Sequence, residues 1–214
     1  MSSSVKTALR AEVKAVLRAL SAEEVETKSS AVVRRLLASS PFAESKVVCC
    51  YLSMPGGEVK TSSIITSCLA AGKRVFVPKV LGKRPADMRM FELESEAQLQ
   101  SFPKSAWGIP EPSSELVLAS PDGCDLGIID LVLVPGVAFD RSCNRLGHGK
   151  GYYDCFLERL LACNAAKAGP VPTFVGLGFD EQLVATVPSE AHDRPLDLLV
   201  TPSEVFAGPD RQGR

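Results

Sequence analysis

Short apolar segments alternate with a helical segment early in the sequence, and this alternation limits the possible folds more than any other feature. Residues 46–52 (KVVCCYL) form an apolar run rich in β-forming residues, and residues 61–71 predict a helix that ends at Gly72. Residues 74–77 predict a second strand, which we expect to stop at Pro78. Because a helix that joins two strands is typical of parallel pairing, we predict an α/β fold with a mostly parallel central sheet.

The rest of the chain extends this pattern without an internal repeat or a linker-like tract. Apolar spacing of three and four residues predicts a helix from Val5 to Leu20, and Ser21 with Glu24 forms a capping box that begins a second helix ending near Ala38. Further strands are predicted at residues 88–93, 131–134, 173–177 and 196–200, and helical segments after Ser95 and at residues 150–163 and 180–184.

These segments predict a single three-layer α/β/α domain over residues 1–206, followed by a flexible tail over residues 207–214. The chain of 214 residues is long enough for a sizeable core. Residues 137–149 are expected to be a loop between the fourth predicted strand and the helix that follows it.

Charge, hydropathy and cysteine usage exclude several classes of protein. Lys and Arg number 24 against 25 Asp and Glu, so net positive charge cannot drive nucleic-acid binding. No apolar run reaches the roughly 18 residues of a membrane span. The seven cysteines are an odd number without a C-x-x-C pair, so they suggest neither a zinc ribbon nor a disulfide framework. We expect a cytoplasmic protein with no membrane or nucleic-acid partner.

Residues 139–154 (FDRSCNRLGHGKGYYD) carry the strongest signal for chemistry, because they lie between a buried strand and a helix. The segment contains three alternating glycines, Gly147, Gly149 and Gly151, and three potential cations, Arg145, His148 and Lys150. Backbone N–H groups of such a loop, together with the helix N-terminus, can bind an anion. No Ser or Thr follows Lys150, and the third glycine of a dinucleotide fingerprint is absent. We predict a phosphate-binding loop; the alternative is a glycine-rich surface turn.

Other candidate residues have an ordinary structural explanation beside a functional one. Asp154 can complement the dipole of the helix that it begins or bind magnesium, and Asp193 can stabilise a turn or do the same. Trp107 can fill the core or stack on a ring, and Glu58 is a loop carboxylate. A basic stripe on the first helix can be solvated or can contact a polyphosphate; its members are Lys6, Arg10, Lys14 and Arg18.

Taken together, these segments resemble the 5-formyltetrahydrofolate cyclo-ligases, also called methenyltetrahydrofolate synthetases. The match is carried by residues 135–140 (PGVAFD) and 145–154 (RLGHGKGYYD). Support elsewhere comes from Lys6 with Arg10, residues 52–54 leading to Glu58 and Thr61, residues 107–112 (WGIPEP), and His192 with Asp193.

The resemblance implies a reaction in which ATP and Mg²⁺ drive closure of 5-formyltetrahydrofolate, with or without a polyglutamate tail, to 5,10-methenyltetrahydrofolate. ADP and phosphate are released. Transfer of a phosphoryl group to the formyl oxygen would create an iminium phosphate, which the nitrogen at position 10 attacks. We expect the protein to act as a monomer.

Residue roles follow from the match. Catalytic roles fall to Arg145, Lys150 and Tyr152. ATP contacts fall to Lys6, Arg10, Arg145, Leu146, Gly147, His148, Gly149, Lys150, Gly151, Tyr152 and Tyr153. Folate contacts fall to Met54, Glu58, Trp107, His148, Gly149, Lys150, Gly151 and Tyr152. The magnesium ligands would be Asp154 and Asp193, while Lys14 and Arg18 stay solvated.

Two departures from the family pattern stand out. Many members have glycine where this chain has Cys143, and a residue with a β-carbon is strained at positive φ, so we expect this turn to differ or to be strained. Residues 55–57 (PGG) form a longer loop than in some members.

Two rival functions use the same residues. One is an ATP-dependent kinase or ligase that acts on another small molecule. The other is a non-catalytic protein that binds folate or nucleotide.

Overall fold

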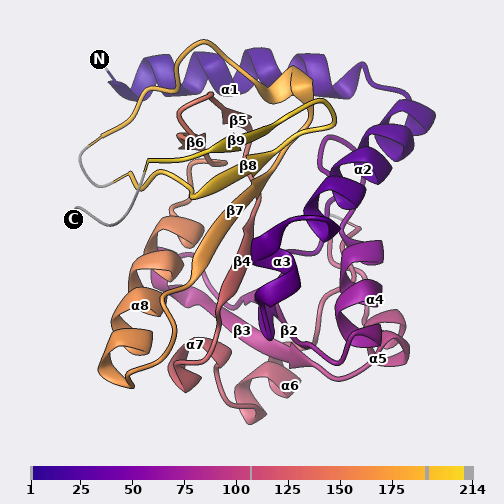
Figure 1. Ribbon diagram of the computed structural model, residues 1–214, viewed down its shortest axis with the longest axis vertical. Coiled ribbons are helices and arrows are strands. Elements are labelled where there is room, and N and C mark those ends of the chain that lie inside the picture. The colour runs from indigo at the N-terminus through magenta and orange to yellow at the C-terminus, as the bar shows by residue number, and fades with distance from the viewer. Residues whose placement is uncertain (1, 107, 191–192, 210–214) are drawn as a thin grey trace.

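The computed structural model describes residues 2–106, 108–190 and 193–209. Within these residues the core is a seven-stranded sheet of order β3-β2-β1-β4-β7-β8-β9 (Figure 1). Its five inner strands are parallel, and the edge strands β3 and β9 are antiparallel to their neighbours. The predicted, mostly parallel sheet is therefore confirmed. The strands are β1 (Val47–Cys49), β2 (Arg74–Val80), β3 (Met88–Leu93), β4 (Leu131–Val134), β7 (Thr173–Leu177), β8 (Leu198–Val200) and β9 (Val205–Ala207).

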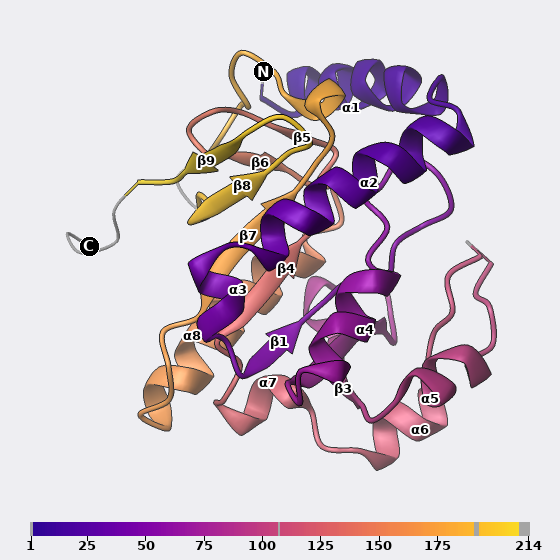
Figure 2. The same cartoon turned by 45° about the vertical axis from the view of Figure 1, so that its right-hand side comes forward.

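Helices cover both faces of this sheet, which gives the predicted three layers (Figures 1 and 2). Alternate residues of the buried strands point to opposite sides. Val48 and Leu133 pack in the core cluster that includes α2 and α4, whereas Cys49 and Val132 pack in the cluster that includes α8. The helices are α1 (Ser2–Arg18), α2 (Ala22–Leu37), α3 (Ser40–Glu44), α4 (Ser62–Ala70), α5 (Glu96–Ser101), α6 (Ser114–Ala119), α7 (Gly123–Leu126) and α8 (Tyr152–Ala166), with 3₁₀ turns η1 (Pro85–Asp87) and η2 (Asp180–Gln182).

Local sequence signals account for the ends of several elements. The capping box before α2 is present, because the Ser21 side chain accepts from the Glu24 N–H and the Glu24 carboxylate accepts from the Ser21 N–H. Gly72 follows α4 at φ +72°, as the helix-ending prediction requires. No helix in the described residues is both long and apolar enough to cross a membrane.

Strand β2 continues through Pro78, so the prediction that it stops there is wrong. Beyond Phe76 this strand pairs only with β3, and Pro78 lies opposite Met90. The Met90 N–H points away from β2 and donates to Asp122 Oδ1 at 3.0 Å. The backbone nitrogen of the opposite residue, Pro78, therefore also points away from β3, to the side where β2 has no partner beyond Phe76. The missing N–H of proline costs no ladder hydrogen bond at this position.

Two other boundaries differ from the predictions. Ala207 pairs with Leu198 in β9, and the Gly208 N–H donates to Asp197 O at 2.7 Å, so the predicted tail begins inside an edge strand. Residues 210–214 of that predicted tail lie outside the described residues. The predicted loop 137–149 contains a two-stranded hairpin, formed by β5 (Ala138–Phe139) and β6 (Arg145–Leu146).

Candidate active site

A cleft of about 820 Å³ lies at the carboxyl end of the parallel strands. Its walls come from the second half of α1, the loop after β1, parts of β2 and β3, the turn after β4, and residues 145–154. Helix α1 lies across this end of the molecule, next to the β5–β6 hairpin (Figure 1). The volume and the position at strand ends are those of a small-molecule site.

The hairpin that leads into the cleft is fixed by a buried carboxylate. Asp140 Oδ1 accepts from the backbone N–H groups of Ser142 and Asn144, at 3.0 and 3.1 Å, and Oδ2 accepts from the Val187 N–H at 2.9 Å. Within this turn Cys143 has φ +61°. The turn therefore keeps the left-handed conformation that favours glycine, and Cys143 bears the expected strain.

The glycine loop 147–151 connects β6 to α8 and has a backbone that only glycine adopts easily. Gly149 has φ +90°, and Gly151, the N-cap of α8, has φ +71°. Arg10 on α1 donates from Nε to Gly147 O at 2.8 Å, so α1 holds the loop in place. No side chain caps the α8 N-terminus within the described residues, which leaves its first N–H groups available to an anion.

Arg145 is nearly buried, with 6% of its side chain exposed, and three groups surround it. It forms an ion pair with Asp154 in the first turn of α8, donates to Pro135 O at 3.2 Å, and lies over the Tyr153 ring at 5.9 Å. Asp154 is 45% exposed and faces the cleft. Arg145, the predicted phosphate cation, and Asp154, the predicted magnesium ligand, therefore neutralise each other's charge in this structure.

A second ion pair joins two other predicted site residues. Lys6 Nζ lies 2.8 Å from Asp193 Oδ2 and 3.5 Å from Glu190 Oε1. Burial alone would lower the pKa of Lys6, but the two carboxylates outweigh it and raise the pKa above its usual value. This pair ties the first helix to the segment before β8, although neither residue lies in the cleft lining found for the described residues.

Glu58 lies on the wall opposite the glycine loop and is 9% exposed. Its Oε2 accepts from the Met54 N–H at 2.8 Å, and its Oε1 lies 3.6 Å from His148 Nε2. The predicted folate-binding loop and the predicted phosphate-binding loop therefore meet across one cleft. Tyr152, at the start of α8, donates its hydroxyl to Gly82 O at 2.9 Å.

The Tyr153 hydroxyl is buried and has no hydrogen-bond partner within the described residues. Burial raises its pKa well above the usual value, so the group is a neutral phenol. Since Tyr153 also lines the cleft, its O–H is a donor to which a ligand can supply the acceptor.

The structure gathers most of the predicted site residues in this cleft. Those that line it are Met54, Glu58, Arg145, Gly147, His148, Gly149, Lys150, Gly151, Tyr152, Tyr153 and Asp154. Leu146 instead packs in the core, and Arg10 acts through the loop backbone. Trp107 lies outside the described residues.

Sequence reasoning did not predict the cleft position of two cations and missed several wall residues. Lys14, which is half-buried, and Arg18, which is exposed, line the cleft, and the sequence did not predict that position for them. The i,i+4 spacing of the basic residues indicated one charged face of the helix. Whether that face borders a cleft depends on where α1 lies relative to the end of the sheet. Wall residues without a chemical signal in the sequence include Tyr51, Ile109, Glu111 and Pro135.

Known proteins are similar to this chain in sequence and fold. The family model for the 5-formyltetrahydrofolate cyclo-ligase family matches residues 2–202. The 5-formyltetrahydrofolate cyclo-ligase of Mus musculus is 36% identical over 194 residues, covering 91% of this chain and 92% of the mouse protein. The Saccharomyces cerevisiae cyclo-ligase is 34% identical over 206 residues, covering 91% and 94%. The solution structure of Aquifex aeolicus 5,10-methenyltetrahydrofolate synthetase superimposes with a TM-score of 0.72 at 30% identity, covering 98% of this chain and 96% of that one.

The fold and these relatives define the molecule as an α/β enzyme of the ligase class, as the sequence predicted. The chain belongs to the 5-formyltetrahydrofolate cyclo-ligase family.

Proposed function

We propose that this protein converts 5-formyltetrahydrofolate to 5,10-methenyltetrahydrofolate, with ATP and Mg²⁺ as co-substrate and metal, and releases ADP and phosphate. The observation that carries the proposal is the meeting of two loops in one cleft. His148 of the glycine loop lies 3.6 Å from Glu58 on the opposite wall. A site of this shape brings a phosphate donor and a flat, polar-edged acceptor together.

The phosphate end of the cleft is proposed to be the glycine loop and the N-terminus of α8. Arg145 and Lys150 supply positive charge there, and the uncapped N–H groups supply fixed donors. Arg10 keeps the loop closed against α1 through its bond to Gly147 O. Lys14 and Arg18 add positive charge along the α1 wall.

The folate end is proposed to lie beside Glu58. A carboxylate there can accept hydrogen bonds from the pterin amino group and ring nitrogen, while its second oxygen stays on the Met54 N–H. Tyr51 and Met54 provide ring and apolar surface in the same part of the cleft. The Tyr153 hydroxyl, which lacks a protein partner in the described residues, can donate to the formyl oxygen or to phosphate.

The proposed chemistry balances in two steps. The formyl oxygen of the substrate attacks the terminal phosphorus of ATP, ADP leaves, and an iminium phosphate forms. The nitrogen at position 10 then attacks the formyl carbon and loses its proton, the C–O bond breaks, and phosphate leaves with that proton as the methenyl bridge closes. Positioning and charge neutralisation are what phosphoryl transfer needs, and Arg145, Lys150 and the loop N–H groups can supply both.

Magnesium fits the carboxylate oxygens that the chain offers at this end of the sheet. Asp154 and Asp193 are hard oxygen donors, and each is paired with a cation here, Asp154 with Arg145 and Asp193 with Lys6. A bound magnesium ion would neutralise phosphate charge. Arg145 would then be freed to face the triphosphate, whereas Lys6, which also pairs with Glu190 and lies outside the cleft lining, would have to turn toward it. The expected cytoplasmic location and monomeric state belong to this proposal as well.

The proposal is tested by following methenyl product in the near ultraviolet after mixing protein, 5-formyltetrahydrofolate, ATP and Mg²⁺. Lys150→Gln should lower kcat/KM at least about 100-fold, because a phosphate cation is lost. Lys167→Gln, on an exposed lysine just after α8, is the matched control and should leave the rate unchanged. Phosphate release without methenyl product would instead support another ATP-dependent acceptor, and folate binding without turnover would support a binding protein.

A further inference from the structure

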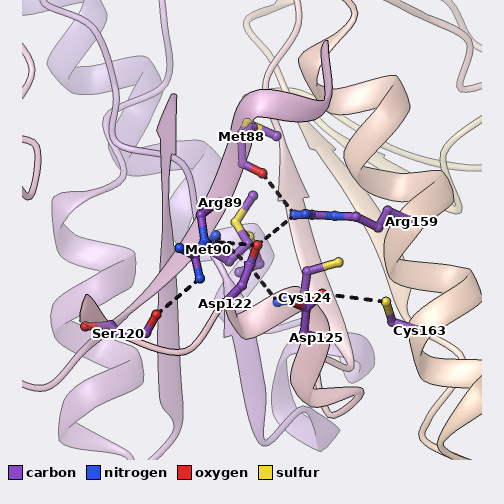
Figure 3. Close-up of polar contacts among 10 residues, drawn as sticks. Met88, Arg89, Met90, Ser120, Asp122, Cys124, Asp125, Arg159 and Cys163 are labelled. Carbon is purple, nitrogen blue, oxygen red and sulfur yellow. Dashed lines mark hydrogen bonds and ion pairs between the residues drawn. The ribbon is translucent and has the colours of Figure 1, made fainter. Parts of the chain in front are cut away.

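A second group of metal-ligating side chains lies away from the cleft, between α7 and α8 (Figure 3). Cys124 and Asp125 are neighbours on α7, and Cys163 is on α8. Their ligand atoms all lie within 4.8 Å of one another, and Cys163 Sγ is 4.0 Å from Asp125 Oδ1. Two thiols and a carboxylate from different elements thus converge on one point.

The spacing is close to that of a tetrahedral metal site. Zinc binds thiolate sulfur at about 2.3 Å and carboxylate oxygen at about 2.0–2.2 Å, so ligand atoms around it are separated by roughly 3.5–3.8 Å. The separations in this structure, at most 4.8 Å, exceed that value by no more than about 1.3 Å. Cys124 is buried, Cys163 is half-buried and Asp125 is exposed, which leaves the fourth position on the solvent side.

A buried carboxylate holds this arrangement in place without being a ligand itself. Asp122 Oδ1 accepts from the Cys124 N–H at 3.1 Å, which fixes the first turn of α7 (Figure 3). Asp122 Oδ2 lies 3.1 Å from Arg159 Nη2, one turn before Cys163 on α8. The Asp122 carboxylate therefore contacts both helices that carry the cluster, α7 through Cys124 and α8 through Arg159. Groups that hydrogen-bond around a metal site orient its ligands in the same way.

The surrounding charge suits a zinc ion with three anionic ligands. Two thiolates and a carboxylate around Zn²⁺ carry a net charge of about −1. Arg159 lies beside Cys124 as well as Asp122, so its guanidinium can offset that charge. A polar cavity of about 480 Å³, lined in part by Asp122, Asp125 and Arg159, adjoins the cluster and gives an ion access from solvent.

We propose that Cys124, Asp125 and Cys163 bind a thiophilic divalent cation, Zn²⁺, with water as the fourth ligand. Binding forms two Zn–S bonds and one Zn–O bond and releases two thiol protons to the buffer. Soft thiolate ligands favour zinc over magnesium, which separates this site chemically from the carboxylates of the cleft. The ion would clamp α7 to α8, whose N-terminus carries the glycine loop.

The test is a titration of the reduced, metal-free protein with Co²⁺, followed by competition with Zn²⁺. We expect a thiolate-to-cobalt charge-transfer band in the near ultraviolet at one ion per chain, which Zn²⁺ abolishes. Cys163→Ser and Asp125→Asn should each weaken Zn²⁺ binding at least about tenfold, and Cys163→Ser should also weaken the band. Cys155→Ser, a half-buried cysteine on the same helix, is the matched control and should change neither.

A further readout separates this site from oxygen-only sites in the cleft. Zn²⁺ binding should release about two protons per ion at neutral pH, and Cys163→Ser should lower that number. The proposal is overturned if no charge-transfer band appears, or if Cys163→Ser binds Zn²⁺ as tightly as the parent protein does. Formation of a Cys124–Cys163 disulfide with peroxide, in a protein that gives no cobalt band, would overturn it in favour of a redox pair.

Discussion

Replacement of Asp122 by asparagine should destabilise the packing of α7 against β3 and α8. The Asp122 side chain is 2% exposed and receives donors from three elements (Figure 3). Its Oδ1 accepts from the N–H groups of Met90 and Cys124, at 3.0 and 3.1 Å. Its Oδ2 lies 3.1 Å from Arg159 Nη2 and 3.5 Å from Arg89 Nε.

The expected cost follows from which of these contacts asparagine can keep. Its amide oxygen can still accept from the two backbone N–H groups, but its NH₂ would face two guanidinium groups. A hydrogen bond to a charged group contributes about 1.5–3 kcal/mol, and breaking a fully buried ion pair costs about 3–5 kcal/mol. Arg89 and Arg159 are 25% and 30% exposed, so water offsets part of the loss. We therefore expect Asp122→Asn to lower the free energy of unfolding by about 3 kcal/mol.

Urea unfolding in the presence of EDTA measures this cost without interference from metal. With a slope of about 2.5 kcal/mol per molar urea, the midpoint should fall by about 1.2 M. Asp125→Asn is the matched control, because it removes the same charge three residues away at an exposed position, and it should shift the free energy by less than about 0.5 kcal/mol. Equal midpoints for the two variants would refute the reasoning.

Three further changes have defined outcomes. Ser21→Ala removes the α2 cap and should cost about 1 kcal/mol, which calorimetry would record as a Tm lower by about 2–4 °C; an unchanged Tm would contradict the capping argument. Burial alone would raise the pKa of Asp180, but the hydrogen bond from Ser203 helps to hold it below its usual value. The resulting stability is present above the unfolded pKa and is lost as pH falls through the folded one, so Asp180→Asn should reduce stability at pH 7 and flatten the acid limb of an unfolding titration; parallel acid limbs would contradict this. Gly149→Ala forces alanine to φ +90° in the glycine loop and should raise the KM for ATP several-fold, whereas Gly72→Ala, at φ +72° after α4, should affect stability alone; similar KM changes in both would argue against a role for the loop.

Elements with strong local signals could be predicted from the sequence. Strands β3 and β4 and the capped start of α2 occur where apolar pattern and capping residues predict them. Strand β9 and the β5–β6 hairpin were not predicted, because such short strands exist only through pairing with segments that a local pattern cannot reveal. The prediction that β2 stops at Pro78 failed for the same reason, because the effect of a proline on a strand depends on which edge of the strand has a partner.

Part of the candidate site could likewise be predicted from the sequence, and part could not. The glycine loop, Arg145 and Asp154 are close in sequence, so the spacing predicted that they would lie together. The cleft positions of Lys14 and Arg18 depend on how α1 crosses the sheet, which only the tertiary structure reveals. The approach of Cys124 to Cys163 likewise follows from helix packing and has no signature in a chain without a C-x-x-C pair.

The central claim is that the cleft couples ATP cleavage to closure of the folate ring. The most direct measurement follows methenyl absorbance and released phosphate in the same reaction of the protein with 5-formyltetrahydrofolate, ATP and Mg²⁺, with an EDTA control. We predict one phosphate for each methenyl group formed, and neither product in EDTA. Phosphate release that does not depend on 5-formyltetrahydrofolate, or a flat absorbance trace despite bound folate, would contradict the account.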